Sequence, residues 1–289
     1  MTIQIPESLS HDLERLAAER RITAQQLALD RLRLGGRPVE HLLRPSPPGS
    51  DQPGDAVALW RYMNLGRFLS MLWGTGDPQF QSGRGALYFS RIREFPDSYE
   101  GAHPSVYGLY PADRRQDCKR LYDWVRLNAA VSCWHEGDDE SVAMWRLYTA
   151  GVEGVAIKTT VAKLTRSIQA DRLEFRVARV FYIGDSESLI PCLDRMPDGL
   201  EAIYCKRLVY QHEREVRAAL IPNRTPGALQ IERDLCCGFR VGVDLPTLLG
   251  GVVVSEPLTV PVVEEALNRA GIHLKVVCSA INRRPHDTC

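Results

Sequence analysis

The chain has 289 residues, of which 44% are hydrophobic and 25% are charged. This composition is typical of a globular protein and suits one large domain or two smaller ones. Lysine plus arginine and aspartate plus glutamate both number 36, so the overall charge gives no argument for a nucleic acid or membrane partner.

Further function classes are disfavoured by missing patterns. No apolar run approaches the roughly 20 residues that span a bilayer, and the N-terminus lacks the basic start and apolar core of a signal peptide. The eight cysteines include no CxxC pair, which argues against a zinc ribbon and a disulfide scaffold. We therefore expect a reduced, cytoplasmic protein.

The first 35 residues predict a strand and two helices. Residues 2–6 alternate polar and apolar side chains up to a proline, and residues 9–16 carry leucines at helical spacing. Thr23 suits the N-cap of a second helix, which the glycines at 35–36 end. A unit of this size cannot bury a core alone, so it needs a second copy of itself.

In order and spacing, residues 1–34 resemble the ribbon-helix-helix family of bacterial DNA-binding proteins. The resemblance implies a homodimer whose paired strands enter the major groove. Thr2 and Gln4 would then face the bases, and the helix N-terminus at Thr23 would hold a phosphate. The segment carries five arginines and five acidic residues, so a dimerisation module that does not bind DNA is the alternative.

Residues 36–56 are dense in proline, glycine and serine, which predicts a flexible linker before a second domain at 57–289. The pattern there predicts strands near 59–64, 86–90, 129–134, 154–159, 177–183, 208–220, 238–245, 251–257 and 274–281, with helices near 65–72, 194–206 and 261–272. Strands and helices do not alternate strictly, so we expect an α+β domain with a central mixed sheet.

Familiar catalytic fingerprints are missing from this domain. It has no GxGxxG after a strand, no GxxxxGK[ST], no GxSxG and no HExxH. Cys133 and His135 could form a nucleophile pair, but a buried cysteine beside a loop histidine is the stronger interpretation. The acidic run at 135–140 is interpreted as a surface loop, and the histidine spacing predicts no metal site.

Glu213 and Glu215 stand two apart within the predicted strand 208–220. Residues two apart in a strand point to the same side of the sheet, so both carboxylates would share a face with Arg217. Such a group is either a ladder of ion pairs or a small acidic site, and the pair alone does not decide between them.

Arg61, Ser90 and the Glu213/Glu215 pair fall on three predicted strands in that order. This order resembles the Arg-Ser-Glu pattern of ADP-ribosyltransferases, although the usual Ser-Thr-Ser triplet is Phe89-Ser90-Arg91 here. The resemblance implies that NAD is the substrate. Glu215 would stabilise positive charge on the ribose and Glu213 would take a proton from the acceptor. Arg61 would hold the diphosphate, and Ser90 would orient the ribose.

Aromatic side chains near these positions are candidates for stacking on the nicotinamide or adenine ring. The cofactor-binding candidates are Arg61, Tyr62, Tyr88, Trp145 and Tyr148. Trp145 and Tyr148 would share one helix face, so core packing is the alternative for both.

A second resemblance covers residues 59–256, which are similar to a widespread bacterial family known as domain of unknown function 2971. The matching phrases are Ser-Cys-Trp at 132–134, Met-Trp-x-x-Tyr at 144–148, Gly-Val-x-Ile at 154–157 and Glu-x-Glu-x-Arg at 213–217. The resemblance implies that the second and fourth phrases belong to one site. It supplies no activity by itself.

These observations predict an NAD-dependent, ADP-ribosyltransferase-like effector that residues 1–35 dimerise or place on DNA. A toxin or phage-defence role follows by analogy only. One alternative is a DNA-binding regulator whose large domain senses a ligand or partner without chemistry. Another is plain hydrolysis of NAD, with water as the acceptor.

Overall fold

The computed structural model describes residues 51–73, 82–97, 99–101, 112–149, 153–168, 174–183, 200–221, 233–234 and 237–281. The predicted ribbon-helix-helix module, with Thr2, Gln4 and Thr23, lies outside the described residues, as does the predicted linker up to residue 50. Both stay predictions. No helix among the described residues is long and apolar enough to cross a membrane.

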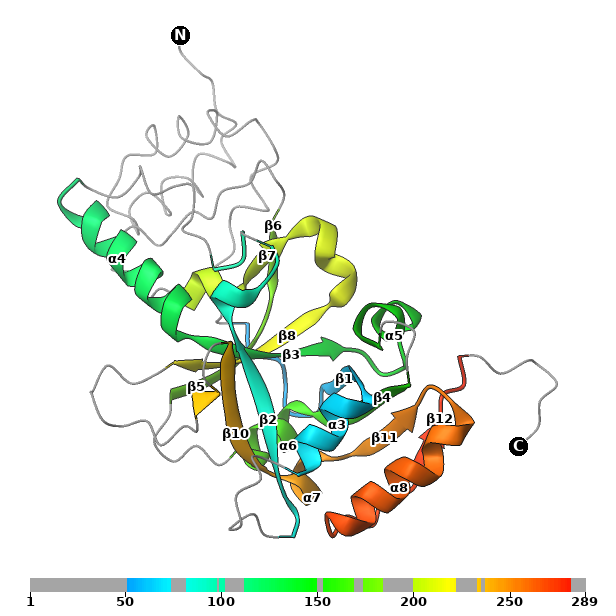
Figure 1. Ribbon diagram of the computed structural model, residues 1–289. Helices are drawn as coiled ribbons and strands as arrows, with labels where there is room; N and C mark the ends of the chain where they lie inside the picture. Colours follow the sequence, from blue (N-terminus) through cyan, green and yellow to red (C-terminus); the bar gives the residue numbers. More distant parts are fainter. Residues whose placement is uncertain are drawn as a thin grey trace.

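Strands are the most numerous elements in the described part of the chain (Figure 1). They are β1 (Ala58–Asn64), β2 (Arg84–Arg91), β3 (Ala130–Glu136), β4 (Gly154–Thr160), β5 (Glu174–Arg179), β6 (Phe181–Ile183), β7 (Cys205–Arg207), β8 (Glu215–Ile221), β9 (Arg233–Asp234), β10 (Gly238–Asp244), β11 (Gly251–Val254) and β12 (Val276–Cys278). The α-helices are α3 (Leu65–Leu72), α4 (Ala112–Asn128), α5 (Val142–Thr149), α6 (Val161–Ser167), α7 (Leu245–Leu248) and α8 (Val260–Arg269). Short 3₁₀ helices are η2 (Ile92–Glu94), η4 (Leu200–Tyr204), η5 (Leu208–Glu213) and η6 (Pro257–Thr259).

Ten strands form one sheet in the order β12-β11-β4-β1-β3-β2-β10-β9, and β8 and β5 extend it from β3. All its described pairs are antiparallel except β11 with β12, so the sheet is mixed. Strands β6 and β7 form a separate parallel pair. The predicted α+β class with a central mixed sheet is confirmed.

Strand β3 pairs with three neighbours, and this arrangement opens the sheet. Strand β8 pairs with residues 130–135 along one edge of β3. Strands β1 and β2 share the other edge, because β1 pairs with residues 135–136 and β2 with residues 130–131. Residues 132–134 lie between these two short ladders, where β1 and β2 diverge.

The passage from β1 to α3 follows directly from the sequence. Asn64 ends the strand, and its side-chain oxygen accepts a hydrogen bond from the Arg67 backbone N–H at 2.9 Å. This cap satisfies one of the free amides at the helix start. Consequently α3 begins immediately after the strand and lies over the sheet (Figure 1).

The predictions for 177–183, 194–206 and 208–220 were wrong in part. Residues 177–183 belong to two strands in different sheets, and the described end of 194–206 is a 3₁₀ helix followed by β7. In 208–220, the first six residues form η5 and β8 starts only at Glu215. Arg214 between them has φ 41° and ψ 54°, a left-handed conformation that interrupts an extended chain.

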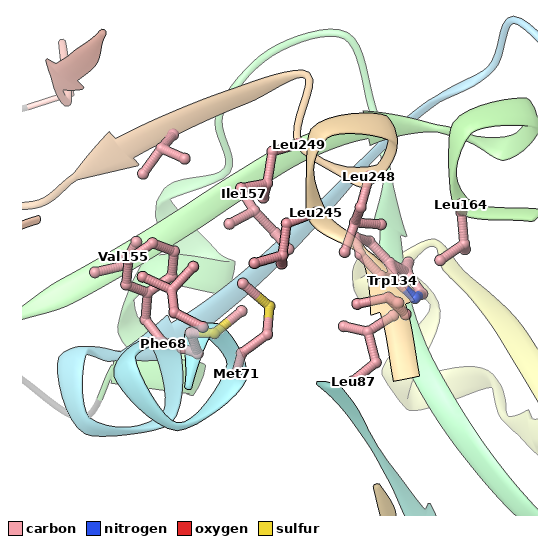
Figure 2. Close-up of a cluster of buried hydrophobic side chains, with 14 of the residues drawn as sticks. Phe68, Met71, Leu87, Trp134, Val155, Ile157, Leu164, Leu245, Leu248 and Leu249 are labelled. Atoms are coloured by element: carbon pink, nitrogen blue, oxygen red, sulfur yellow. The ribbon is translucent and has the colours of Figure 1, made fainter. Parts of the chain in front are cut away.

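The main core lies between the sheet and helices α3, α6, α7 and α8. Figure 2 shows Phe68 and Met71 of α3 beside Val155 of β4 and Leu245 of α7. Apolar residues of α3 recur at three- and four-residue spacing, so one face of this short helix is buried. The core therefore fixes α3 against one wall of the opening beside β3.

We expect Phe68→Ala to lower the free energy of unfolding by about 3–5 kcal/mol, because a fully buried ring leaves a cavity when it is removed. Leu258→Ala is the control, since Leu258 is 89% exposed and should change stability by at most about 0.5 kcal/mol. Urea unfolding of the full chain measures both. Equal costs would contradict the described packing of α3.

Candidate functional site

A cavity of about 740 Å³ lies at the opening between β1, β2 and β3. Its volume falls within the roughly 300–1,000 Å³ of small-molecule and cofactor sites. Seven residues predicted from the sequence line it, and they are Arg61, Tyr62, Tyr88, Ser90, Tyr148, Glu213 and Glu215. Residues that are up to 154 positions apart in the chain therefore meet around one space.

One wall of the cavity is formed by a buried group of charges that we call the carboxylate cluster. It is made of Glu100, Lys206, Glu213, Glu215 and Arg217, and all of these except Arg217 line the cavity. Lys206 Nζ lies 3.0 Å from Glu213 Oε2, 3.2 Å from Glu215 Oε2 and 3.5 Å from Glu100 Oε1. Arg217 also pairs with Glu100. Three carboxylates thus share two cations, which leaves one negative charge in excess when all are ionised.

Glu215 is held on both oxygens. Arg217 Nε lies 3.0 Å from Oε1 and Arg217 Nη2 lies 3.0 Å from Oε2, a two-pronged arrangement that suits a guanidinium. Burial raises the pKa of this carboxyl, but Arg217 and Lys206 outweigh burial and hold the pKa at about 2. Glu215 is therefore a fixed anion at neutral pH.

Glu213 is placed differently from Glu215. It ends helix η5, ahead of the left-handed Arg214, and so does not share a strand with Glu215 as the sequence predicted. Its Oε2 accepts hydrogen bonds from the Tyr148 hydroxyl at 2.9 Å and from Lys206 at 3.0 Å. Because both contacts reach one oxygen, Glu213 can still offer its other oxygen to a molecule in the cavity.

Tyr148 connects helix α5 to this cluster. Burial, followed by the charges of Glu213 and Glu215, raises the pKa of the Tyr148 phenol far above its ordinary value. The hydroxyl therefore keeps its proton and donates a hydrogen bond to Glu213. This contact joins the Met-Trp-x-x-Tyr and Glu-x-Glu-x-Arg segments at one place.

Arg61 forms a cationic wall of the cavity. Its Nη1 donates to Ser132 Oγ on β3 at 2.5 Å, and its Nη2 donates to the Tyr88 carbonyl oxygen on β2 at 3.0 Å. Both acceptors are neutral, and the guanidinium lies 5.7 Å from the ring of Trp134. Burial lowers the pKa of Arg61 to about 10, so the group is a cation at neutral pH.

Ser132 is the serine that contacts Arg61, a role that sequence reasoning missed. Its hydroxyl is buried and also accepts from Trp134 Nε1 at 3.1 Å. Ser90 lines the same cavity from β2, at the residue that pairs with Val131. The Ser-Cys-Trp phrase at 132–134 could have indicated Ser132, because it lies on β3, between the strands β1 and β2 that carry Arg61 and Ser90.

The remaining aromatic candidates divide into two groups. Tyr62 and Tyr88 line the cavity, and the Tyr62 hydroxyl accepts the Ser141 backbone N–H at 2.8 Å. Trp145 packs edge-on against Tyr62 with ring centroids 5.1 Å apart, and its Nε1 donates to Glu140 at 2.9 Å. Trp145 does not line the cavity, so its contacts are those of a buried support for Tyr62.

Cys133 and His135 also face the cavity. Burial, followed by Glu215, raises the pKa of the Cys133 thiol well above its ordinary value, which disfavours a reactive thiolate. Burial lowers the pKa of His135, whose Nδ1 lies 2.7 Å from the Glu213 carbonyl oxygen and must donate to it. Within the described residues, no group of three or more His, Cys, Asp or Glu side chains could hold a metal ion.

Comparisons of the chain with protein-family models, with curated proteins and with solved structures found no match. The fold and the cavity define an α+β domain with a cationic wall and a buried carboxylate cluster. The function is therefore inferred from the geometry of this site.

The carboxylate cluster predicts acid sensitivity. Because the native pKa of Glu215 is held at about 2, below its ordinary 4.5, its ionised form stabilises the fold above about pH 4.5. This contribution, on the order of 3 kcal/mol, is lost as the pH falls toward 2. We expect Glu215→Gln to flatten the dependence of unfolding free energy on pH in this range, measured by urea unfolding. The exposed Glu265→Gln should leave the wild-type slope, and an unchanged slope in Glu215→Gln would refute the assignment.

Arg217→Met tests the pairing itself. It leaves Glu100 and Glu215 without their guanidinium in a buried site, so we expect a loss of about 3–5 kcal/mol of unfolding free energy at neutral pH. Arg269→Met breaks an exposed pair with Glu265 and should cost at most about 1 kcal/mol. Thermal and urea unfolding distinguish the two, and similar losses would contradict a buried cluster.

Proposed function

We propose that this protein is an ADP-ribosyltransferase-like enzyme that uses NAD as its substrate. The observation that carries the proposal is that Arg61, Ser90, Glu213 and Glu215 line one cavity together with Tyr62, Tyr88 and Tyr148. The Arg-Ser-Glu order in the sequence thus corresponds to a shared space.

The distribution of charge in the cavity supports this substrate. NAD carries a negative diphosphate and a positive nicotinamide ring at separate places along one molecule. The cavity offers a cationic wall at Arg61 and an anionic wall at Glu213 and Glu215. The cationic wall would therefore face the diphosphate and the anionic wall the nicotinamide ribosyl group, and the tyrosine rings of the cavity suit the flat bases.

The reaction would break the bond between ribose C1′ and the nicotinamide nitrogen. Nicotinamide leaves with the bonding electron pair, and positive charge develops on the ribose. A fixed carboxylate beside that charge stabilises the transition state more than the ground state. The acceptor then attacks C1′, and its proton passes to a carboxylate.

The contacts favour a different division of roles between the two glutamates from the one that the sequence predicted. Both oxygens of Glu215 are taken by Arg217 and Lys206, whereas the contacts of Glu213 reach only Oε2. We assign Glu213 to the developing ribose charge. Glu215 acts through Lys206, which it keeps protonated and in place beside Glu213.

The biological setting follows the sequence resemblance alone. Residues 1–35 would dimerise the chain and could direct it to DNA, and an effector role in a toxin or in phage defence would suit such an enzyme. Water as the acceptor would make the same site an NAD hydrolase.

One observation favours a second candidate function. Glu215 and Arg217 are fully engaged in ion pairs, which is what a non-catalytic ligand-sensing domain of a DNA-binding regulator would need. In such a sensor, the carboxylates would keep the fold and no bond of NAD would break. The two candidates therefore differ in turnover and agree in ligand binding.

Nicotinamide release from NAD by the full-length protein tests the proposal. We expect Glu213→Gln to lower release by about 100-fold or more, because one preorganised charge at the reacting centre is lost. Glu265→Gln is the matched control on the surface and should keep wild-type release. Far-ultraviolet circular dichroism and melting temperature would show that the Glu213 variant is folded.

The remaining outcomes separate the candidates. No release by wild type, with NAD raising the melting temperature, would favour the sensor. Release that Glu213→Gln leaves unchanged would refute the assignment of this carboxylate. Recovery of free ADP-ribose, with none attached to protein or nucleic acid, would identify water as the acceptor.

A further inference from the structure

Two further arginines flank the cationic wall of the cavity. Arg67 lies in the first turn of α3, and Arg240 lies on β10, and both line the cavity together with Arg61. Sequence reasoning assigned neither of them. They approach from different elements, so their meeting is a property of the fold.

A chain of contacts brings these arginines together. Arg240 Nη2 donates to Ser70 Oγ on α3 at 2.8 Å. Ser70 stands three residues after Arg67, and positions three apart on a helix are neighbours on one face. Arg240 also pairs across the sheet with Tyr88, whose carbonyl oxygen accepts from Arg61. Ser70 thus links Arg240 to the helix that carries Arg67, and Tyr88 links the strand of Arg240 to Arg61.

Arginines gathered on one side of a cavity favour the binding of an anion. Within the part of the chain that the structure describes, neither Arg61 nor Arg67 pairs with a carboxylate. Arg67 is close enough to Arg61 that, after burial, its charge helps to lower the pKa of Arg61. Holding cations together in a partly buried place costs free energy, and a bound anion offsets that cost.

We infer that Arg67, Arg240 and Ser70 form a phosphate-binding subsite beside Arg61. Phosphate oxygens accept strong hydrogen bonds from guanidinium groups and from hydroxyl groups. Arg61 gives hydrogen bonds to two strands and is fixed, whereas Arg67 is exposed and can adjust to a ligand. The subsite rests on this geometry, and its use for a dinucleotide rests on the proposed function.

Binding of inorganic pyrophosphate to the full-length protein, measured by isothermal titration calorimetry, tests the subsite. We expect Arg67→Gln and Arg240→Gln each to weaken binding about tenfold or more, since each removes a charge-assisted contact. Arg166→Gln on α6 is the matched control, because Arg166 is exposed and does not line the cavity. Raising the salt concentration should weaken pyrophosphate binding to the wild-type protein more than to a variant that carries both Arg67→Gln and Arg240→Gln.

The ligand's own phosphates can be distinguished with NAD and NADP. If both variants weaken the binding of NAD and of NADP equally, the subsite holds the diphosphate. If they weaken the binding of NADP alone, the subsite holds the additional phosphate on the ribose. Both results support the subsite.

Failure of the subsite and failure of the proposed function are separable. Pyrophosphate affinity that neither arginine variant changes, or that Arg166→Gln changes as much, would overturn the subsite whatever the turnover of NAD. Arginine-dependent pyrophosphate binding without nicotinamide release would keep the subsite and refute the enzyme.

Discussion

The divided edge of strand β3 is the constraint on which the rest of the site depends. Strand β8 takes one whole edge, so β1 and β2 can pair only with opposite ends of the other. The backbone between those ends still requires partners, because buried polar groups are seldom left alone. Arg61 reaches across this opening to Ser132 and to the Tyr88 carbonyl oxygen, so one side chain ties three strands around the cavity.

Charge is separated across this opening in a way that folding alone would not favour. A buried ion cluster gains little stability over well-packed apolar side chains of the same volume. Arg61 is not neutralised by the carboxylate cluster, since its guanidinium donates only to neutral oxygens. A cavity with both features is therefore better explained by a ligand that carries both signs of charge than by stability.

Sequence patterns predicted the core strands and helix α8, because alternation and helical spacing record which face is buried. They missed the break at Arg214, because a left-handed arginine leaves no mark in a pattern of hydrophobicity. Arg217 pairs with Glu100, which lies 117 residues away in the sequence. Arg240 donates a hydrogen bond to Ser70, which lies 170 residues away. Such contacts depend on topology, so a single sequence could indicate the glutamates and Arg61 but not these partners.

Arg214, directly after Glu213, is a strained residue beside the acidic wall of the cavity. A non-glycine residue in a left-handed conformation costs on the order of 1–2 kcal/mol, and glycine there would remove most of that cost. The turn brings Glu213 to Lys206 and Tyr148 while Glu215 begins the strand. Without it, an extended chain would carry both carboxylates on one strand face. The strained Arg214 thus directly follows Glu213, the buried carboxylate that we assign to the reaction, as expected where function opposes stability.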